Sequence, residues 1–167
     1  HGLEKYKIPH DTDGFVELDF LLQFKKFSDI SINMVKQVVS DNSKKRFDMK
    51  IVNDKIYIRA NQGHSSGKLD DTKMLENITE PIKGCFHGTY KKHLASIEKN
   101  GLSRMSRKHI HIAESEDAIS GQRSNCNLYI YINMQLAIND GIKFYRSSNG
   151  VILTPGNDDG YLLPKYL

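Results

Sequence analysis

FHGTYKKHLASIEKNGLSRMSRKHIHIA, residues 86–113, predicts the end of a strand, a helix, a loop and a second strand, in that order. Apolar residues recur at helical spacing after the first strand, and Asn100-Gly101 is typical of the point where a helix ends. Residues 103–108 are expected to form a basic loop, and polar and apolar residues alternate over residues 109–112, as in a half-buried strand. Residues 86–113 therefore predict a strand–helix–loop–strand segment at the centre of the fold.

Positive charge is concentrated in the same unit. Between His87 and Ala113 there are six Lys or Arg residues and one acidic residue, Glu98, while His87, His109 and His111 lie at the two strand ends. A glycine after the first histidine lets a ligand approach the backbone, and the next hydroxyl, on a threonine, can donate to a ribose or a phosphate. Two interpretations fit the spacing equally well: an anion-binding cleft rimmed by imidazoles, or a surface helix with a solvated basic face.

Short strands dominate the C-terminal part of the chain and predict an α+β fold there. The expected strands are residues 85–87, 110–112, 128–132, 143–146 and 151–153. Residues 128–132 alternate Leu or Ile with Tyr, which predicts a strand packed on both faces. The chain has no glycine-rich dinucleotide fingerprint and no P-loop, so a dinucleotide here would not be held in the Rossmann manner.

Residues 1–66 are predicted to form a separate small module. A turn at residues 11–14 precedes a strand-like entry and a short helix within residues 15–24, and residues 31–39 show the spacing of a second amphipathic helix. Two alternating stretches around Asn53-Asp54 then predict a hairpin. Helices followed by a hairpin describe a winged helix, a fold that binds nucleic acid or serves as a plain protein-interaction module. A polar connection, residues 67–83, would join it to the second lobe, residues 84–167.

Composition points to an intracellular globular protein. The 167 residues are 38% hydrophobic and 26% charged, which suits folded domains rather than disorder. Cys85 and Cys126 lie far apart, without the spacing of a disulfide framework or of a zinc site, so we expect a reducing compartment, cytoplasmic or nuclear, and no metal. The net charge of +4 favours a polyanionic partner only weakly.

Two cationic segments could bind phosphate. Arg46 follows two lysines, and Arg107 lies in a second basic segment directly before a strand. An arginine can hold two phosphate oxygens at once, and neighbouring lysines add to the positive potential. By themselves, both segments are more often solvated surface.

Several motifs in a fixed order resemble those of the RNA 2′-phosphotransferase family, NAD⁺-dependent enzymes that remove the splice-junction 2′-phosphate from tRNA. The resemblance covers nearly the whole chain. It is carried by DGFVELDFLL (13–22), KKRF (44–47), NQGHS (61–65), HGT (87–89), MSRKHIHIA (105–113), ISGQRS (119–124) and GVILTPG (150–156).

The resemblance implies a two-lobed α+β protein, with an N-terminal winged-helix lobe for RNA and a C-terminal lobe of the ADP-ribosyltransferase fold for NAD⁺. The family's catalytic set is an Arg-His pair and two further arginines. By motif, His1, Arg46 and Arg107 match three members of that set, and the fourth, an arginine, would precede His1. The implied NAD⁺-binding residues are His87, Gly88, Thr89, His111, Ser120, Gly121 and Arg123. No metal is implied.

The resemblance also implies a two-step reaction. The RNA 2′-phosphate attacks C1″ of the nicotinamide ribose and expels nicotinamide; the ribose O2″ then attacks that phosphate, releasing 2′-OH RNA and ADP-ribose 1″,2″-cyclic phosphate. The expected partners are NAD⁺ and tRNA or another RNA with an internal 2′-phosphate, bound by a monomer that does not associate with membranes. The alternative is an ADP-ribosyltransferase that modifies a nucleic-acid terminal phosphate or a protein. A non-enzymatic RNA-binding adaptor is disfavoured by the intact HGT, MSRKHIH and SGQRS motifs.

Overall fold

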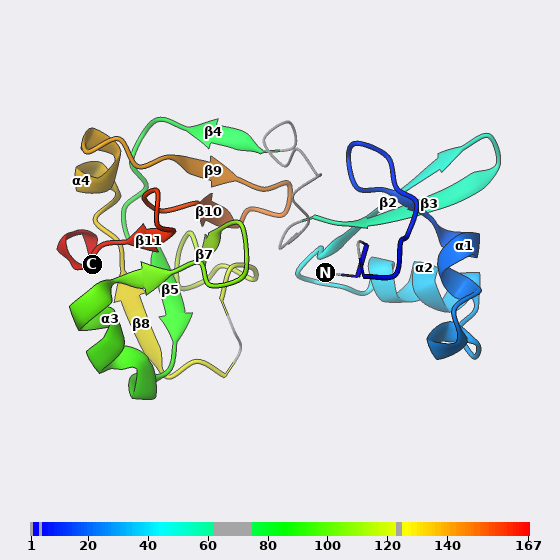
Figure 1. The fold of residues 1–167 in the computed structure, drawn as a ribbon, viewed down its shortest axis with the longest axis horizontal. Coiled ribbons are helices and arrows are strands. Elements are labelled where there is room, and N and C mark those ends of the chain that lie inside the picture. Colours follow the sequence, from blue (N-terminus) through cyan, green and yellow to red (C-terminus); the bar gives the residue numbers. More distant parts are fainter. Residues whose placement is uncertain (1, 4, 62–74, 123–124) are drawn as a thin grey trace. The chain divides into compact units, whose positions relative to one another are not determined.

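The computed structural model describes residues 2–3, 5–61, 75–122 and 125–167, and the chain divides into two compact units. Unit 1 is residues 1–74 and unit 2 is residues 75–167. Both contain small sheets and short helices, so the predicted mixture of helices and strands is confirmed (Figure 1). Each unit is described by itself.

Unit 1 combines two α-helices with a three-stranded antiparallel sheet of order β1-β3-β2. Its elements are β1 (Val16–Glu17), α1 (Leu18–Leu22), η1 (Lys25–Phe27), α2 (Ile32–Ser40), β2 (Phe47–Val52) and β3 (Lys55–Ala60). Helix α2 begins after Ser31, whose Oγ accepts from the Met34 backbone N–H at 3.2 Å. Asn53 and Asp54 both have positive φ, 47° and 60°, as a two-residue hairpin turn requires. The predicted helix and hairpin are therefore confirmed.

The core of unit 1 is small. Phe15, Val16 and Leu18 are buried where β1 meets α1. The Nζ of Lys50 and the guanidinium carbon of Arg59 lie 4.0 and 4.4 Å from the centre of the Phe15 ring, and so close the core with cation–π contacts.

The described residues of unit 2 form three sheets and two α-helices. Its elements are β4 (Glu76–Ile78), β5 (Phe86–Thr89), η3 (Lys91–His93), α3 (Leu94–Asn100), β6 (Leu102–Ser103), β7 (Ile110–Ile112), β8 (Leu128–Tyr131), α4 (Met134–Asn139), β9 (Phe144–Arg146), β10 (Ile152–Thr154), β11 (Tyr161–Leu162) and η4 (Pro164–Tyr166). One sheet has the order β4-β9-β10-β7, and β5-β8 and β6-β11 form two-stranded antiparallel sheets. Of the predicted connection, residues 67–74 lie outside the described residues, and β4 belongs to the four-stranded sheet.

The core of unit 2 lies where the strands meet the two helices. It contains the buried side chains of Cys85, Ile97, Leu102, Ile110, Ile112, Ile132, Met134, Ala137, Phe144, Ile152, Leu162 and Tyr166. Strands β5 and β8 run beside each other next to α3 (Figure 1).

The prediction that residues 128–132 pack on both faces is wrong. The side chains of Tyr129 and Tyr131 remain 43% and 47% exposed on one face of β8, although both rings contact Phe86. Among the described strands, β8 pairs with β5 alone, and the amphipathic tyrosine rings tolerate contact with water.

Candidate functional site

His87 lies where β5 meets the end of β7. The backbone groups of Phe86 exchange hydrogen bonds with those of Ala113, at 3.0 and 2.8 Å, which fixes the two strands side by side. The His87 ring then reaches across, with Nδ1 2.7 Å from the carbonyl oxygen of His111. Because a carbonyl can only accept, Nδ1 of His87 carries a proton and donates it to this bond.

His111, on β7, carries an imidazole whose pKa is strongly lowered. Burial lowers its pKa to about 4, and the positive charge of Arg107 and the neighbouring imidazoles of His109 and His87 act in the same direction. His111 is therefore neutral at pH 7, and Arg107 lies close enough to affect its ionisation. The structure thus brings together three predicted site residues: His87, His111 and Arg107.

Gly88 faces the segment that follows the ISGQRS motif. A Cβ on Gly88 would lie 2.9 Å from Sγ of Cys126 and 3.4 Å from Cβ of Gln122. The neighbouring Thr89 is almost fully buried, and its carbonyl accepts from the Asn127 N–H at 3.0 Å. A side chain at position 88 would have to displace the Cys126 sulfur, so this backbone is packed against Cys126 and Gln122.

Ser120 and Gly121 lie against the end of β7. Gly121 has φ 92°, and a Cβ there would lie 2.7 Å from the carbonyl oxygen of Ile112. Ser120 is buried beside it. The two residues therefore belong to the same neighbourhood as His111, and the glycine has a structural reason: the chain passes too close to β7 for any side chain.

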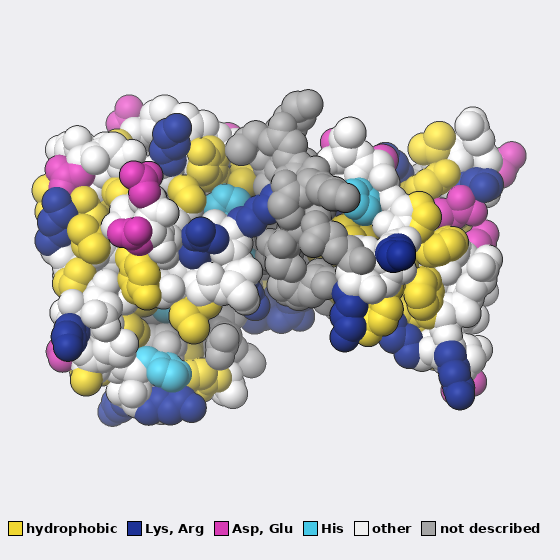
Figure 2. Space-filling view, in the orientation of Figure 1, with side chains coloured by type: hydrophobic (Ala, Val, Ile, Leu, Met, Phe, Trp, Pro, Cys, Tyr) yellow, Lys and Arg dark blue, Asp and Glu magenta, His cyan; other side chains and the backbone are white. Residues whose placement is uncertain are grey.

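Arg107 is exposed on the loop between β6 and β7, before His109 and β7. The ring of His109 packs edge-on against Tyr145, with 6.1 Å between ring centres. The visible face of unit 2 carries Lys and Arg in separate places, among acidic and apolar side chains (Figure 2). The positive charge expected from the sequence is therefore not one continuous patch on this face.

The remaining predicted residues are His1, Arg123 and Arg46. His1 and Arg123 lie outside the described residues. Arg46 belongs to unit 1, where its backbone is held at the start of β2: its N–H donates to Asn42 Oδ1 at 3.2 Å, and its carbonyl accepts from Asn61 at 2.9 Å.

Sequence reasoning missed two residues that shape the site. Cys126 packs on Gly88, and Arg104 holds the loop that carries Arg107. The sequence shows that Arg104 belongs to the basic segment. Its contacts, however, depend on the pairing of β6 with β11, and strands of two residues have no recognisable sequence pattern.

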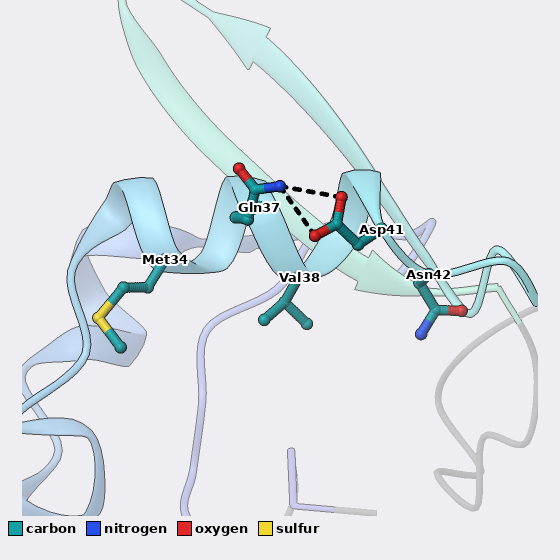
Figure 3. A pocket seen from close by; sticks show the side chains of 5 residues that line it. All are labelled: Met34, Gln37, Val38, Asp41 and Asn42. Atoms are coloured by element: carbon teal, nitrogen blue, oxygen red, sulfur yellow. Dashed lines mark hydrogen bonds between the residues drawn. The ribbon is translucent and has the colours of Figure 1, made fainter.

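A groove on α2 is lined by Met34, Gln37, Val38, Asp41 and Asn42, the last of which accepts from the Arg46 N–H (Figure 3). Met34 and Val38 point from one side of the helix, and Gln37 donates to both carboxylate oxygens of Asp41, at 2.9 and 2.8 Å.

Among the described residues, no three His, Cys, Asp or Glu side chains are grouped to hold a metal ion. Within that same part of the chain, every helix is too short or too polar to cross a bilayer.

Comparison with known proteins identifies the family. The description "RNA 2′-phosphotransferase, Tpt1 / KptA family" matches residues 1–156. The chain is 45% identical over 176 residues to tRNA 2′-phosphotransferase 1 of Homo sapiens, covering 99% of this chain and 68% of that protein. It is 41% identical over 174 residues to the Danio rerio protein of the same name, covering 99% and 77%. It is 43% identical over 158 residues to a putative tRNA 2′-phosphotransferase of Schizosaccharomyces pombe, covering 92% and 43%. This chain therefore belongs to the RNA 2′-phosphotransferase family and is a transferase.

Proposed function

We propose that this protein transfers an internal 2′-phosphate of RNA, such as the splice-junction phosphate of tRNA, to NAD⁺. The products are 2′-OH RNA, nicotinamide and ADP-ribose 1″,2″-cyclic phosphate. One observation carries the proposal: in a chain of this family, the ends of β5 and β7 bring His87, His111, Arg107 and the Ser120-Gly121 turn into one neighbourhood.

In the first step, a phosphate oxygen bonds to C1″ of the nicotinamide ribose while the bond to the nicotinamide nitrogen breaks, and nicotinamide leaves neutral. A phosphate is already an anionic nucleophile, so the protein needs to supply position and positive charge rather than a strong base. In the second step, O2″ bonds to phosphorus and the bond to the RNA 2′-oxygen breaks. The proton lost from O2″ balances the proton gained by the RNA oxygen.

We assign NAD⁺ binding to His87, Gly88, Thr89, His111, Ser120, Gly121 and Arg123. Nδ1 of His87 donates to the His111 carbonyl, which fixes the orientation of the ring, and we assign this ring to a ribose hydroxyl of NAD⁺. His111 is neutral at pH 7, so its ring can accept or donate a hydrogen bond without adding charge beside the phosphates.

We assign the phosphate to Arg107 together with Arg46 and His1. A guanidinium can bind two phosphate oxygens, and charge stabilisation of this kind is worth on the order of 10²–10³ in rate for each group. The β1-β3-β2 order, with α1 and α2 between β1 and β2, supports a winged-helix RNA lobe in residues 1–66. The small antiparallel sheets of unit 2 support an ADP-ribosyltransferase-like lobe for NAD⁺ in residues 84–167.

The test is to incubate the protein with RNA carrying one internal 2′-phosphate and NAD⁺, and to separate the products. We expect 2′-OH RNA together with the cyclic phosphate. Replacing Arg107 by alanine should lower the rate by about 10²–10³ or stop the reaction at an ADP-ribosylated RNA. Lys92→Ala removes one charge from the exposed surface beside the site and should leave the rate near that of the unmodified protein.

The competing hypothesis is an ADP-ribosyltransferase that completes only the first step. The same assay separates the two: ADP-ribosylated RNA that persists at long times, with no cyclic product, would favour the competing hypothesis. Failure to consume 2′-phosphorylated RNA in the presence of NAD⁺ would reject both activities on this substrate.

A further inference from the structure

Both backbone groups of Arg107 are bonded to a single neighbour, Arg104. The N–H of Arg107 donates to the Arg104 carbonyl at 3.1 Å, which closes a tight turn. The carbonyl of Arg107 accepts from Nη1 of the Arg104 guanidinium at 2.8 Å. Met105, inside this turn, has a positive φ of 54°. The position of Arg107 on its loop therefore depends on Arg104 twice.

Arg104 is in turn anchored to the segment before β11. Its N–H donates to the Gly160 carbonyl at 2.9 Å, which extends the pairing of β6 with β11. Its side chain lies directly across Gly160: a Cβ there would be 2.3 Å from Nε and 2.9 Å from Cγ and Cδ. Gly160 has φ 81° and donates to the Asn157 carbonyl at 2.8 Å, so the surface under Arg104 is itself fixed.

The two arginines differ in exposure, and this separates their roles. Arg107 is exposed, which leaves its guanidinium accessible to a ligand. Arg104 is half-buried, and Nη1 is bonded to a backbone carbonyl rather than directed outward. A guanidinium that donates to a carbonyl within its own loop fixes geometry, because the planar group holds the backbone in one orientation.

We propose that Arg104 is a positioning residue that sets the Arg107 guanidinium beside His111 for contact with the phosphate. This inference rests on the proposed function in one respect only, the role given to Arg107. Misplacing a reacting or stabilising group by about 1 Å can cost on the order of 10²-fold in rate, so a loop anchor outside the site can matter as much as a contact.

The experiment is a double-mutant cycle measured under single-turnover conditions with enzyme in excess. We expect Arg104→Ala to lower the rate by ~10–100-fold in the unmodified protein and by less than ~3-fold when Arg107 is already alanine. Arg104→Lys keeps one donor for the Arg107 carbonyl and should recover most of the loss. Lys99→Ala, the matched removal of an exposed positive charge on α3, should have no effect.

A second arm does not depend on activity. The ionisable groups that face His111 are Arg107, His109 and His87, so removing the positive charge of Arg107 should raise the pKa of His111 in an NMR titration. Arg104→Ala should raise it in the same direction, because the loop no longer holds Arg107 in place, while Arg104→Lys should not. Thermal unfolding of each variant checks that unit 2 remains folded.

Equal losses from Arg104→Ala in both backgrounds would overturn the proposal, since the effect would then not pass through Arg107. An unchanged His111 titration in folded Arg104→Ala, where Arg107→Ala does shift it, would also overturn it. If the unmodified protein does not process 2′-phosphorylated RNA, the proposed function fails, and the titration still decides whether Arg104 positions Arg107.

Discussion

Gly88→Ala should destabilise unit 2 through one identified contact. The new Cβ would lie 2.9 Å from Sγ of Cys126, whereas the next contacts, Cβ of Gln122 at 3.4 Å and Cβ of Cys126 at 3.5 Å, are near ordinary packing distances. Non-bonded carbon contacts are optimal at about 3.5–4.0 Å, so only the sulfur is displaced substantially. Overpacking of this kind costs about 1–3 kcal/mol, and the midpoint of thermal unfolding should fall by about 5–20 °C.

The sulfur can be removed independently. Cys126 is half-exposed, so Cys126→Ala alone should cost little. In that background the contacts left to Gly88→Ala are Cβ of Gln122 at 3.4 Å and Cβ of residue 126 at 3.5 Å, and the loss of backbone freedom in the unfolded chain should offset part of the remaining cost by about 0.4–1 kcal/mol. We therefore expect a coupling energy of about 1–2 kcal/mol between the two positions.

The assay is thermal unfolding of the unmodified protein, both single variants and the double variant, followed by circular dichroism. Thermal unfolding alone does not tell which of the two units is destabilised. Hydrogen exchange of the β5 amides should therefore be measured as well, because these amides report on the stability of unit 2. An equal cost of Gly88→Ala with and without the Cys126 sulfur would refute the reasoning and place the strain elsewhere in the backbone.

Three further results should follow. Gly101→Ala should cost about 3 kcal/mol or more in unfolding free energy, since φ is 85° and the new Cβ would lie 2.1 Å from a β11 carbonyl oxygen; Gly141→Ala, with φ 87° and no atom within 4 Å, is the control and should cost clearly less. As the pH falls from about 6.5 to 4, the unfolded chain binds a proton at His111 that the folded chain does not bind, so the free energy of unfolding should drop by about 3 kcal/mol. Denaturant titrations of His111→Gln over the same pH range should not show this drop. A thiol reagent at pH 8 should label one cysteine of the native chain, Cys126, and a second only after unfolding, because Cys85 is buried and its pKa is raised to about 11; labelling of both in the native state would contradict the buried position.

The elements with a strong local signal were predictable from the sequence. Helix α2 has an amphipathic pattern and a serine cap, and the β2–β3 hairpin has alternating residues around Asn53-Asp54. The pairs β6–β11 and β4–β9 were not predictable. Their strands have two or three residues, and they pair with segments distant in the sequence, so neither periodicity nor turn chemistry identifies them. The exposed face of β8 was wrongly predicted because tyrosine alternation does not tell whether a second layer covers the strand.

The candidate site was predictable as a set of motifs but not as an arrangement. The HGT and HIH motifs lie on strands that the sequence identifies, and their proximity follows once β5 and β7 meet at Phe86 and Ala113. The packing of Cys126 on Gly88 and the hold of Arg104 on Arg107 depend on loops whose course is set by tertiary contacts. No local pattern encodes such contacts, and they were therefore missed.

The edge position of β4 has a consequence for synthesis of the protein. Strand β4 is the first strand of unit 2 to leave the ribosome, yet Glu76 pairs with Arg146 and Ile78 with Phe144. The loop between β4 and β9 is long and therefore closes slowly, and β4 stays unpaired until β9 has been translated. The hairpin of unit 1, by contrast, needs only neighbouring residues and can form while the ribosome is still translating unit 2. A nascent chain stalled before residue 144 should therefore expose β4 to chaperones and proteases while the β2–β3 hairpin is already protected.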